Sequence, residues 1–378
     1  NLASGASGRC GGMYMQLFGR DLNIDKTKER LMLTKMNSEM IPILQEKLGD
    51  FEFRVRGSLD VALTDDEFRD MAEIYTVQRS LGDEEIQLLD KNETKKQMPT
   101  LTDHIAGSRY RPSDGNLSPF KMVMAFANGA KKKGALVLTN TKVRKILEKN
   151  GRISGVETSR GIIESEWVVN ATNAWASFLT KEVEVIPVRE LAMVTERVPP
   201  LKTCTFEARC AEDFAYGCTQ TKSGNLLLGG PGLPTIKGNT YDYYDETIYL
   251  HEVQKCAVYI KNLLPTLQHI NVIRSWAGTM AFTPDGIPHI GLVPGKEGLV
   301  IAAGFAAGMS EAAAVGKLIS ELVAHGKFSV NMEAFDPGRP SAKPIEWPHP
   351  YKHEDLHEFL AVKLGSLQLA KERSQRNV

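Results

Sequence analysis

Two glycine-rich segments are the strongest candidates for chemistry in this sequence. Residues 4–12 read Ser-Gly-Ala-Ser-Gly-Arg-Cys-Gly-Gly, and residues 304–308 read Gly-Phe-Ala-Ala-Gly between an apolar run and a helical pattern. Glycine permits positive φ and close approach, so the backbone N–H groups of such loops can bind an anionic or carbonyl-rich ligand. Each segment alone favours an ordinary tight turn. The dinucleotide motif G-x-G-x-x-G does not occur in the chain.

Two other patterns suggest metal chemistry, but the sequence favours neither. His353-Glu-Asp-Leu-His357 matches H-E-x-x-H, which on a helix places two imidazoles on one face for zinc. The surrounding helical pattern is strongly polar and few residues follow it, so a solvated tail helix is the preferred interpretation. The spacings of Cys204, Cys210 and Cys218 match no zinc template and indicate free thiols. We therefore predict no metal site.

Length and composition indicate a globular protein of two or three domains that binds a small ligand. The chain has 378 residues, of which 42% are hydrophobic and 24% charged. Its 46 Lys+Arg balance 46 Asp+Glu, which argues against nucleic acid or an anionic membrane as partner. Five cysteines without a CxxC pair favour a reducing compartment, and we predict a cytoplasmic protein. No apolar run is long enough to span a bilayer.

Periodicity predicts alternating helices and strands, with a mostly antiparallel sheet between two α/β portions. Residues 186–275 alternate in hydrophobicity and are rich in turns, which predicts that sheet. An Asn150-Gly151 hairpin turn joins two short strands. Helices are predicted at 25–48, 66–82, 119–133, 245–263 and 309–325, and strands at 51–64, 135–139, 141–147, 153–158, 167–170 and 298–304.

Three blocks of sequence, together with the first glycine-rich segment, resemble one known family. They are the run from GNLSPF to VVNATNAWA, the run RSWAGTMAFTPDGIPHIG, and the run GLVIAAGFAAGMSEAAAVG. In this order, over about residues 1–330, they resemble the D-amino-acid-oxidase-like FAD-dependent oxidoreductases, which include glycine oxidase, sarcosine oxidase and the beta subunit of proline dehydrogenase. The segment SGASGRCGG resembles the family's loop over the flavin ring.

The resemblance implies a two-domain α/β (α+β) fold. A Rossmann-like FAD-binding domain of glutathione-reductase type is expected over 1–48, 100–185 and 275–330, with an antiparallel substrate domain over 49–99 and 186–274. Residues 331–378 form a C-terminal extension. The family's dinucleotide fingerprint lies upstream of Asn1, so the resemblance also implies an N-terminally truncated chain.

The resemblance further assigns positions to the ligands, and it requires the two glycine-rich segments to meet around the flavin ring. Substrate contacts are expected at Tyr216, Met280 and Met309. Cofactor contacts are expected at Gly5, Ser7, Arg9, Gly11, Gly12, Met13, Val143, Ala171, Thr172, Trp175, Gly278, Gly304, Phe305, Ala306, Ala307, Gly308, Met309 and Ser310.

Two departures from the family pattern concern the ligands. Thr279-Met280 follows Trp276-Ala-Gly278, so the arginine that clamps the substrate carboxylate in glycine oxidase is missing. Candidate replacements are Arg9, Arg54, Arg56 and Arg111, and none is convincing. The cysteine that carries covalent flavin in sarcosine oxidase would fall at Gly278, which implies non-covalent FAD. The loop at 304–310 is one residue shorter than the family's.

By resemblance, the chain oxidises the C–N bond of a small amino acid, N-methyl amino acid or imino acid. A hydride would move from the substrate Cα–H to flavin N5, and water would hydrolyse the imine. The electron acceptor would be O2 or a partner subunit, and the protein would form a homo- or hetero-oligomer. The alternative function is a non-catalytic, flavoprotein-like subunit or truncated scaffold that no longer holds FAD.

Overall fold

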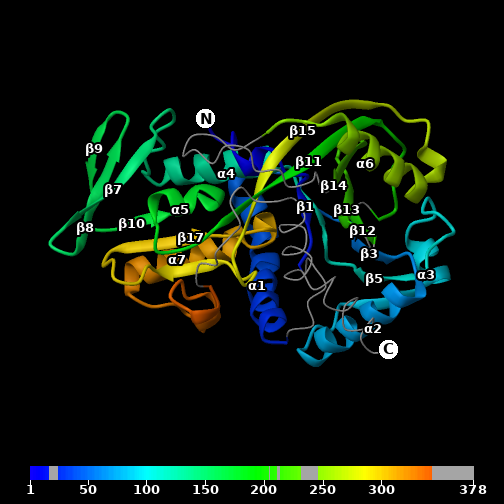
Figure 1. Ribbon diagram of the computed structural model, residues 1–378, viewed down its shortest axis with the longest axis horizontal. Helices are drawn as coiled ribbons and strands as arrows, with labels where there is room; N and C mark the ends of the chain where they lie inside the picture. The colour runs from blue at the N-terminus through cyan, green and yellow to red at the C-terminus, as the bar shows by residue number, and fades with distance from the viewer. Residues whose placement is uncertain (17–23, 204, 211–212, 231–245, 343–378) are drawn as a thin grey trace.

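The computed structural model describes residues 1–16, 24–203, 205–210, 213–230 and 246–342, and shows a mixed α/β fold (Figure 1). A large sheet lies on one side with helices α2 (Asp65–Ser80), α3 (Lys91–Gln97) and α6 (Leu250–Leu263). Helix α7 (Ala312–His325) lies on the other side with two smaller sheets, and helix α1 (Ile24–Leu48) runs between the two parts (Figure 1). The smaller sheets contain β7 (Val143–Lys149), β8 (Arg152–Thr158) and β9 (Gly161–Glu164), and β10 (Val168–Asn170) and β17 (Leu299–Ala303). This arrangement agrees with the predicted fold class.

The large sheet has eight strands in the order β15-β11-β14-β13-β12-β3-β5-β4. All neighbours are antiparallel except β12 and β3, as the alternation of residues 186–275 predicts. Helix α6 (Leu250–Leu263) packs on one face of the sheet over a core that includes Leu191, Phe206 and Tyr216. The strands are β3 (Ser58–Ala62), β4 (Gln87–Asp90), β5 (Gly107–Arg111), β11 (Ile186–Arg197), β12 (Thr205–Cys210), β13 (Asp213–Gln220), β14 (Asn225–Gly230) and β15 (Val272–Phe282).

A second sheet contains a parallel pair of strands. In the order β10-β17-β16, β10 (Val168–Asn170) runs parallel to β17 (Leu299–Ala303), and β16 (His289–Leu292) antiparallel to it. Helix α7 (Ala312–His325) packs its apolar face on this sheet, and α1 (Ile24–Leu48) contributes Leu33 to the same core. A buried parallel strand leading into a helix is typical of a nucleotide-binding α/β unit.

Two smaller sheets complete the strands. One has β7 (Val143–Lys149), β8 (Arg152–Thr158) and β9 (Gly161–Glu164), and the other has β1 (Met13–Tyr14), β6 (Gly115–Asn116) and β2 (Arg54–Val55). Asn150 and Gly151 join β7 to β8 with φ of 53° and 79°, the left-handed backbone that a type I′ hairpin turn requires.

Side-chain caps set where the remaining helices begin. Thr64 accepts from the Glu67 N–H at the start of α2 (Asp65–Ser80), and Ser118 caps α4 (Pro119–Lys132). Asp90 and Glu93 form a capping box on α3 (Lys91–Gln97). The short helical elements are α5 (Ala176–Leu179) and the 3₁₀ turns Ala6–Gly8, Asn173–Trp175, Pro265–Leu267, Gly308–Ser310, Glu333–Phe335 and Pro340–Ala342.

The structure differs from the sequence predictions at several places. Helix α6 begins at Leu250, later than predicted, and the strand predicted at 51–64 is two short strands, β2 and β3, in different sheets. The run 135–139 is not a strand: Leu136 is 86% exposed, and no described strand pairs with it. Helix α7 begins at Ala312, three residues later than predicted, because Gly308–Ser310 form a 3₁₀ turn. The large sheet takes in β5 and all of β15, which the predicted division of the chain placed largely with the FAD-binding domain.

Part of the predicted C-terminal extension is built into the fold. Phe335 is fully buried in the core between α7 and the second sheet. Arg339 donates two hydrogen bonds to Asp285, from Nε to Oδ2 (2.7 Å) and from Nη2 to Oδ1 (2.9 Å). The H-E-x-x-H pattern and Cys204 lie outside the described residues. No helix in the described ranges is long and apolar enough to cross a membrane.

We expect the His289→Gln variant to lose less unfolding free energy than the wild-type protein when the pH is lowered. Burial, followed by the charge of Arg339, lowers the pKa of His289 from 6.5 to about 4, so the folded chain binds this proton less readily than the unfolded chain. The contribution of His289 is therefore complete above pH 6.5 and is lost as the pH falls toward about 4, by about 3 kcal/mol. Urea unfolding at about pH 5 and about pH 7.5 measures it. An equal acid loss in both proteins would contradict the expectation.

Candidate active site

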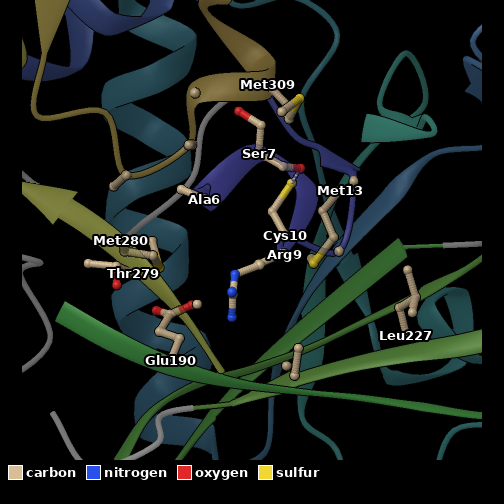
Figure 2. A pocket seen from close by; sticks show the side chains of 18 of the residues that line it. Ala6, Ser7, Arg9, Cys10, Met13, Glu190, Leu227, Thr279, Met280 and Met309 are labelled. Atoms are coloured by element: carbon tan, nitrogen blue, oxygen red, sulfur yellow. Dashed lines mark hydrogen bonds between the residues drawn. The ribbon is translucent and has the colours of Figure 1, made fainter. Parts of the chain in front are cut away.

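The two glycine-rich segments line one cavity of about 220 Å³, which is bounded on a third side by the large sheet (Figure 2). From the first segment come Gly11 and Gly12, and from the second come Phe305 through Gly308. Strands β11, β14 and β15 form the sheet side. Segments almost three hundred residues apart in sequence therefore face each other across one space, as the resemblance requires.

Specific contacts hold the first glycine-rich segment in place. The backbone N–H of Met15 donates to Ser310 Oγ (3.1 Å), and Trp276 Nε1 donates to the carbonyl of Arg9 (2.7 Å). Gly12 has a φ of +70°, and a Cβ at this position would lie 2.2 Å from the carbonyl oxygen of Leu117. Only glycine fits this turn, because both the backbone conformation and the close approach exclude a side chain.

Asn173 anchors the second glycine-rich segment. Its side-chain Oδ1 accepts hydrogen bonds from the backbone N–H groups of Gly304 (2.9 Å) and Phe305 (3.0 Å). Asn173 has a φ of 48°, and asparagine tolerates this left-handed conformation better than most residues. It also lines the cavity. The sequence prediction chose its neighbours Ala171, Thr172 and Trp175 and missed Asn173, although an asparagine in the loop after a short strand was a usable signal.

A second asparagine fixes the helix that follows this loop. Oδ1 of Asn37, on α1, accepts from the N–H groups of Ala313 (2.8 Å) and Ala314 (3.2 Å), and its Nδ2 donates to Tyr14 Oη (3.1 Å). The first turn of α7 is thus capped from another helix. Loop 304–310 is consequently held at both ends, by Asn173 and by Asn37.

The cavity offers unpaired donors and apolar walls. The backbone N–H groups of Gly11, Ala306 and Ala307 donate to no acceptor in the described part of the chain. Apolar side chains surround them. On the sheet side, the cross-strand row Ala192, Gly229 and Gly217 carries almost no side chains, so the strand backbone itself forms the wall and leaves open space. Unpaired amides between apolar walls suit a planar ligand whose edge carries carbonyl oxygens, and the isoalloxazine of FAD is such a ligand.

Opposite charges meet in the cavity. Arg9 forms an ion pair with Glu246 (Nη2 to Oε2, 2.7 Å), and its Nη1 donates to the carbonyl of Ala277 (2.9 Å). Glu190 lines the sheet side, and burial, followed by the negative charge of Glu207, raises its pKa to about 8. No sequence pattern singles out Glu190, because a single acidic residue in an alternating strand is expected to face solvent.

The structure places most of the predicted ligand-binding residues at this cavity, and several elsewhere. Those lining it are Ser7, Arg9, Gly11, Gly12, Met13, Gly278, Met280, Phe305, Ala306, Ala307, Gly308, Met309 and Ser310. Those outside the lining are Gly5, Val143, Ala171, Thr172, Trp175, Tyr216 and Gly304. Gly304 still belongs to the anchored loop. A Cβ on Gly5 would lie 4.0 Å from the Trp175 ring, so these two residues pack beside each other.

Tyr216 is a correction to the sequence prediction. It is buried in the core on the face of the large sheet opposite the cavity, where its ring stacks on Tyr259 with the centroids 4.0 Å apart. Successive residues of a strand point to opposite faces, so its neighbour Gly217 lies on the cavity side. The candidate replacement cations Arg54 and Arg56 also bond elsewhere, to the carbonyls of Gln220 and Lys202 respectively.

In the described ranges, no group of three His, Cys, Asp or Glu side chains is placed to hold a metal ion. Arg111 pairs with the buried Asp83 and not with the cavity. Arg9 is therefore the one candidate cation that reaches the lining among the described residues.

Comparisons with known proteins point to one family. The model of the FAD dependent oxidoreductase family matches residues 1–322. The chain is 29% identical to glycine oxidase of Geobacillus kaustophilus over 348 residues, which cover 88% of this chain and 87% of that protein. It is 30% identical to hydrogen cyanide synthase subunit HcnC of Pseudomonas aeruginosa over 282 residues, which cover 72% of this chain and 64% of HcnC, just under two thirds of its length.

A solved structure gives the same result. The chain superposes on L-proline dehydrogenase from P. horikoshii with a TM-score of 0.78 and 30% identity, covering 88% of this chain and 87% of that one.

We expect Gly12→Ala to destabilise the protein by at least about 2 kcal/mol, because it adds strain at positive φ to a clash with the Leu117 carbonyl. The matched control is Gly11→Ala. A Cβ at Gly11 makes only ordinary contacts, at 3.9 Å from Met13 and Thr219, so its cost should stay below about 1 kcal/mol. Denaturant unfolding measures both variants. Equal losses would mean that the cavity wall does not depend on the left-handed turn.

Proposed function

Because the chain belongs to the FAD dependent oxidoreductase family, whose cofactor is FAD, we propose that it oxidises the C–N bond of a small amino acid, N-methyl amino acid or imino acid. The observation that carries the proposal is the cavity between the two glycine-rich segments, with its unpaired amides and apolar walls. The similarity to glycine oxidase and to L-proline dehydrogenase supports this substrate class.

When bound, FAD would supply the acceptor for the hydride lost from the carbon next to the substrate nitrogen. The protein's part is to hold and shield. Gly11, Ala306 and Ala307 present the N–H groups that would bind the carbonyl edge of the ring. Asn173 keeps the loop carrying two of these donors in position. We further propose that FAD is bound non-covalently.

The walls of the cavity would keep bulk water away from the reacting carbon. Met13, Trp276 and Phe305 supply apolar surface around the space, and a dry environment strengthens the remaining polar contacts there. Arg9 is held by Glu246 and the Ala277 carbonyl, so its positive charge is already partly neutralised before a substrate carboxylate binds. A substrate carboxylate therefore has a weaker electrostatic anchor here than an unpaired arginine would provide. O2 or a partner subunit is proposed as the final electron acceptor.

Spectroscopy and turnover test this proposal. The FAD-loaded protein should show the visible absorption of an oxidised flavin, which should bleach when glycine, sarcosine or L-proline is added without oxygen. Assays with oxygen and with an artificial acceptor then separate oxidase from dehydrogenase activity. Failure to retain FAD would favour a scaffold instead. Retained FAD that no amine or amino acid bleaches would contradict the proposed reaction.

A further inference from the structure

Glu190 carries a carboxyl group into the cavity from the middle of β11. Figure 2 shows that its side chain points from the sheet into the cavity, and that the side chain of Arg9 points into the same space from the opposite wall. Its cross-strand partner on β15 is Gly278, so no neighbouring side chain covers it from that strand. The carboxyl is half-buried, and it lines the cavity.

No group in the part of the chain that the structure describes neutralises this carboxyl. Within the described residues, the carboxyl group of Glu190 takes part in no hydrogen bond and no ion pair. The only cationic side chain in the described lining is Arg9, and its guanidinium is paired with Glu246. A carboxylate in a partly dehydrated space without a partner is unfavourable, and a cationic ligand would supply the missing partner.

A second acidic residue lies at the far end of the cross-strand row of small residues. Glu207 on β12 is 2% exposed. It lies in one cross-strand row with Gly217 on β13, Gly229 on β14 and Ala192 on β11. Ala192 lies two residues from Glu190 on the same face of β11. Because this row has almost no side chains, the negative charge of Glu207 acts on Glu190. The field on this side of the cavity therefore favours a cation.

On the basis of the proposed function, we propose that Glu190 binds the protonated nitrogen of the substrate and accepts its proton. The N–H bond breaks, its electron pair stays on nitrogen, and the proton forms an O–H bond on Glu190. The substrate becomes the neutral amine, whose lone pair can assist departure of the hydride from the adjacent carbon. The cavity would thus select substrates by an ammonium group that bears N–H, and a carboxylate would contribute less to affinity.

The ionisation of Glu190 suits this role. A pKa of about 8 places the carboxyl near the range in which a proton acceptor works at neutral pH. The groups facing it are Glu207 on β12, the Arg9–Glu246 pair and the Cys10 thiol. A bound ammonium favours the ionised carboxylate. The affinity for a cationic amine should therefore rise with pH up to about 8, while the amine itself stays protonated.

Binding of two nearly isosteric probes to the FAD-loaded protein tests the proposal without turnover. tert-Butylammonium is a cation that lacks a hydrogen on the carbon bearing nitrogen, so it cannot be oxidised there. tert-Butanol is its neutral counterpart. Tryptophan fluorescence reports binding, since Trp276 lines the cavity. Glu190→Gln should weaken the binding of tert-butylammonium by about tenfold or more, abolish the rise of affinity with pH, and leave tert-butanol unchanged.

Glu196→Gln is the matched control, because it is the same change on the same strand outside the cavity lining, where Glu196 bonds Asn271. It should bind both probes like the wild type. Glu190→Asp keeps the charge, and it should keep the preference for the cation over the alcohol even if Glu190→Gln fails to fold.

Unchanged affinity of tert-butylammonium in Glu190→Gln, or an equal loss for tert-butanol, would overturn the inference. So would loss of the cation preference in Glu207→Gln with its retention in Glu190→Gln, which would transfer the role to Glu207. If the cation binds in a Glu190-dependent way but no amine reduces FAD, the proposed reaction fails and the ammonium site stands.

Discussion

A single side-chain carbonyl, that of Asn173, accepts two consecutive backbone N–H groups, and the shape of the cavity depends on it. By binding Gly304 and Phe305, Asn173 fixes the point at which the chain leaves the buried strand β17. The next residues then present their N–H groups to the cavity instead of to one another. Without this bond, a short loop containing two alanines would have no local reason to expose unpaired donors, because buried backbone groups find partners wherever they can.

The large sheet determines what else the ligands meet. Alternation along β11 sends Leu191 into the core and Glu190 into the cavity. The same rule applies on β13, where Tyr216 belongs to the core and Gly217 to the cavity side. The sheet thus separates a conventional hydrophobic core from the cavity, and the row Ala192, Gly229 and Gly217 on the cavity side leaves room for a ligand. One face of these strands packs in the core that stabilises the fold, and the opposite face lines the cavity.

Residue patterns predicted the regular elements well where local signals agree. The helices predicted at 66–82 and 119–133 begin at the expected places because Thr64 and Ser118 cap them. The prediction of a strand at 135–139 was wrong, because an apolar run forms a strand only where another strand lies beside it. The meeting of Gly12 with the loop at 304–308 followed from the family resemblance, since no periodicity relates segments so far apart.

The site was predictable only in part. The glycine-rich motifs drew attention to Gly11 and Ala306, which do line one cavity, whereas Tyr216 was assigned to the wrong face of the sheet by one residue. Asn173 carried only a weak sequence signal, because the two N–H groups that it binds are supplied by the tertiary structure. Glu190 could not be selected, because the cavity that it lines forms only in the folded chain.

The bond between Arg339 and Asp285 has a practical meaning for anyone choosing where to end a shortened chain. Asp285 lies three residues beyond β15, the strand that delivers Trp276 and Met280 to the cavity. Ending the polypeptide at 330 would strip a buried carboxylate of its guanidinium and leave a hole where Phe335 sits. Residues 331–342 thus support the position of β15, which lines the cavity, and a minimal folding unit has to include them.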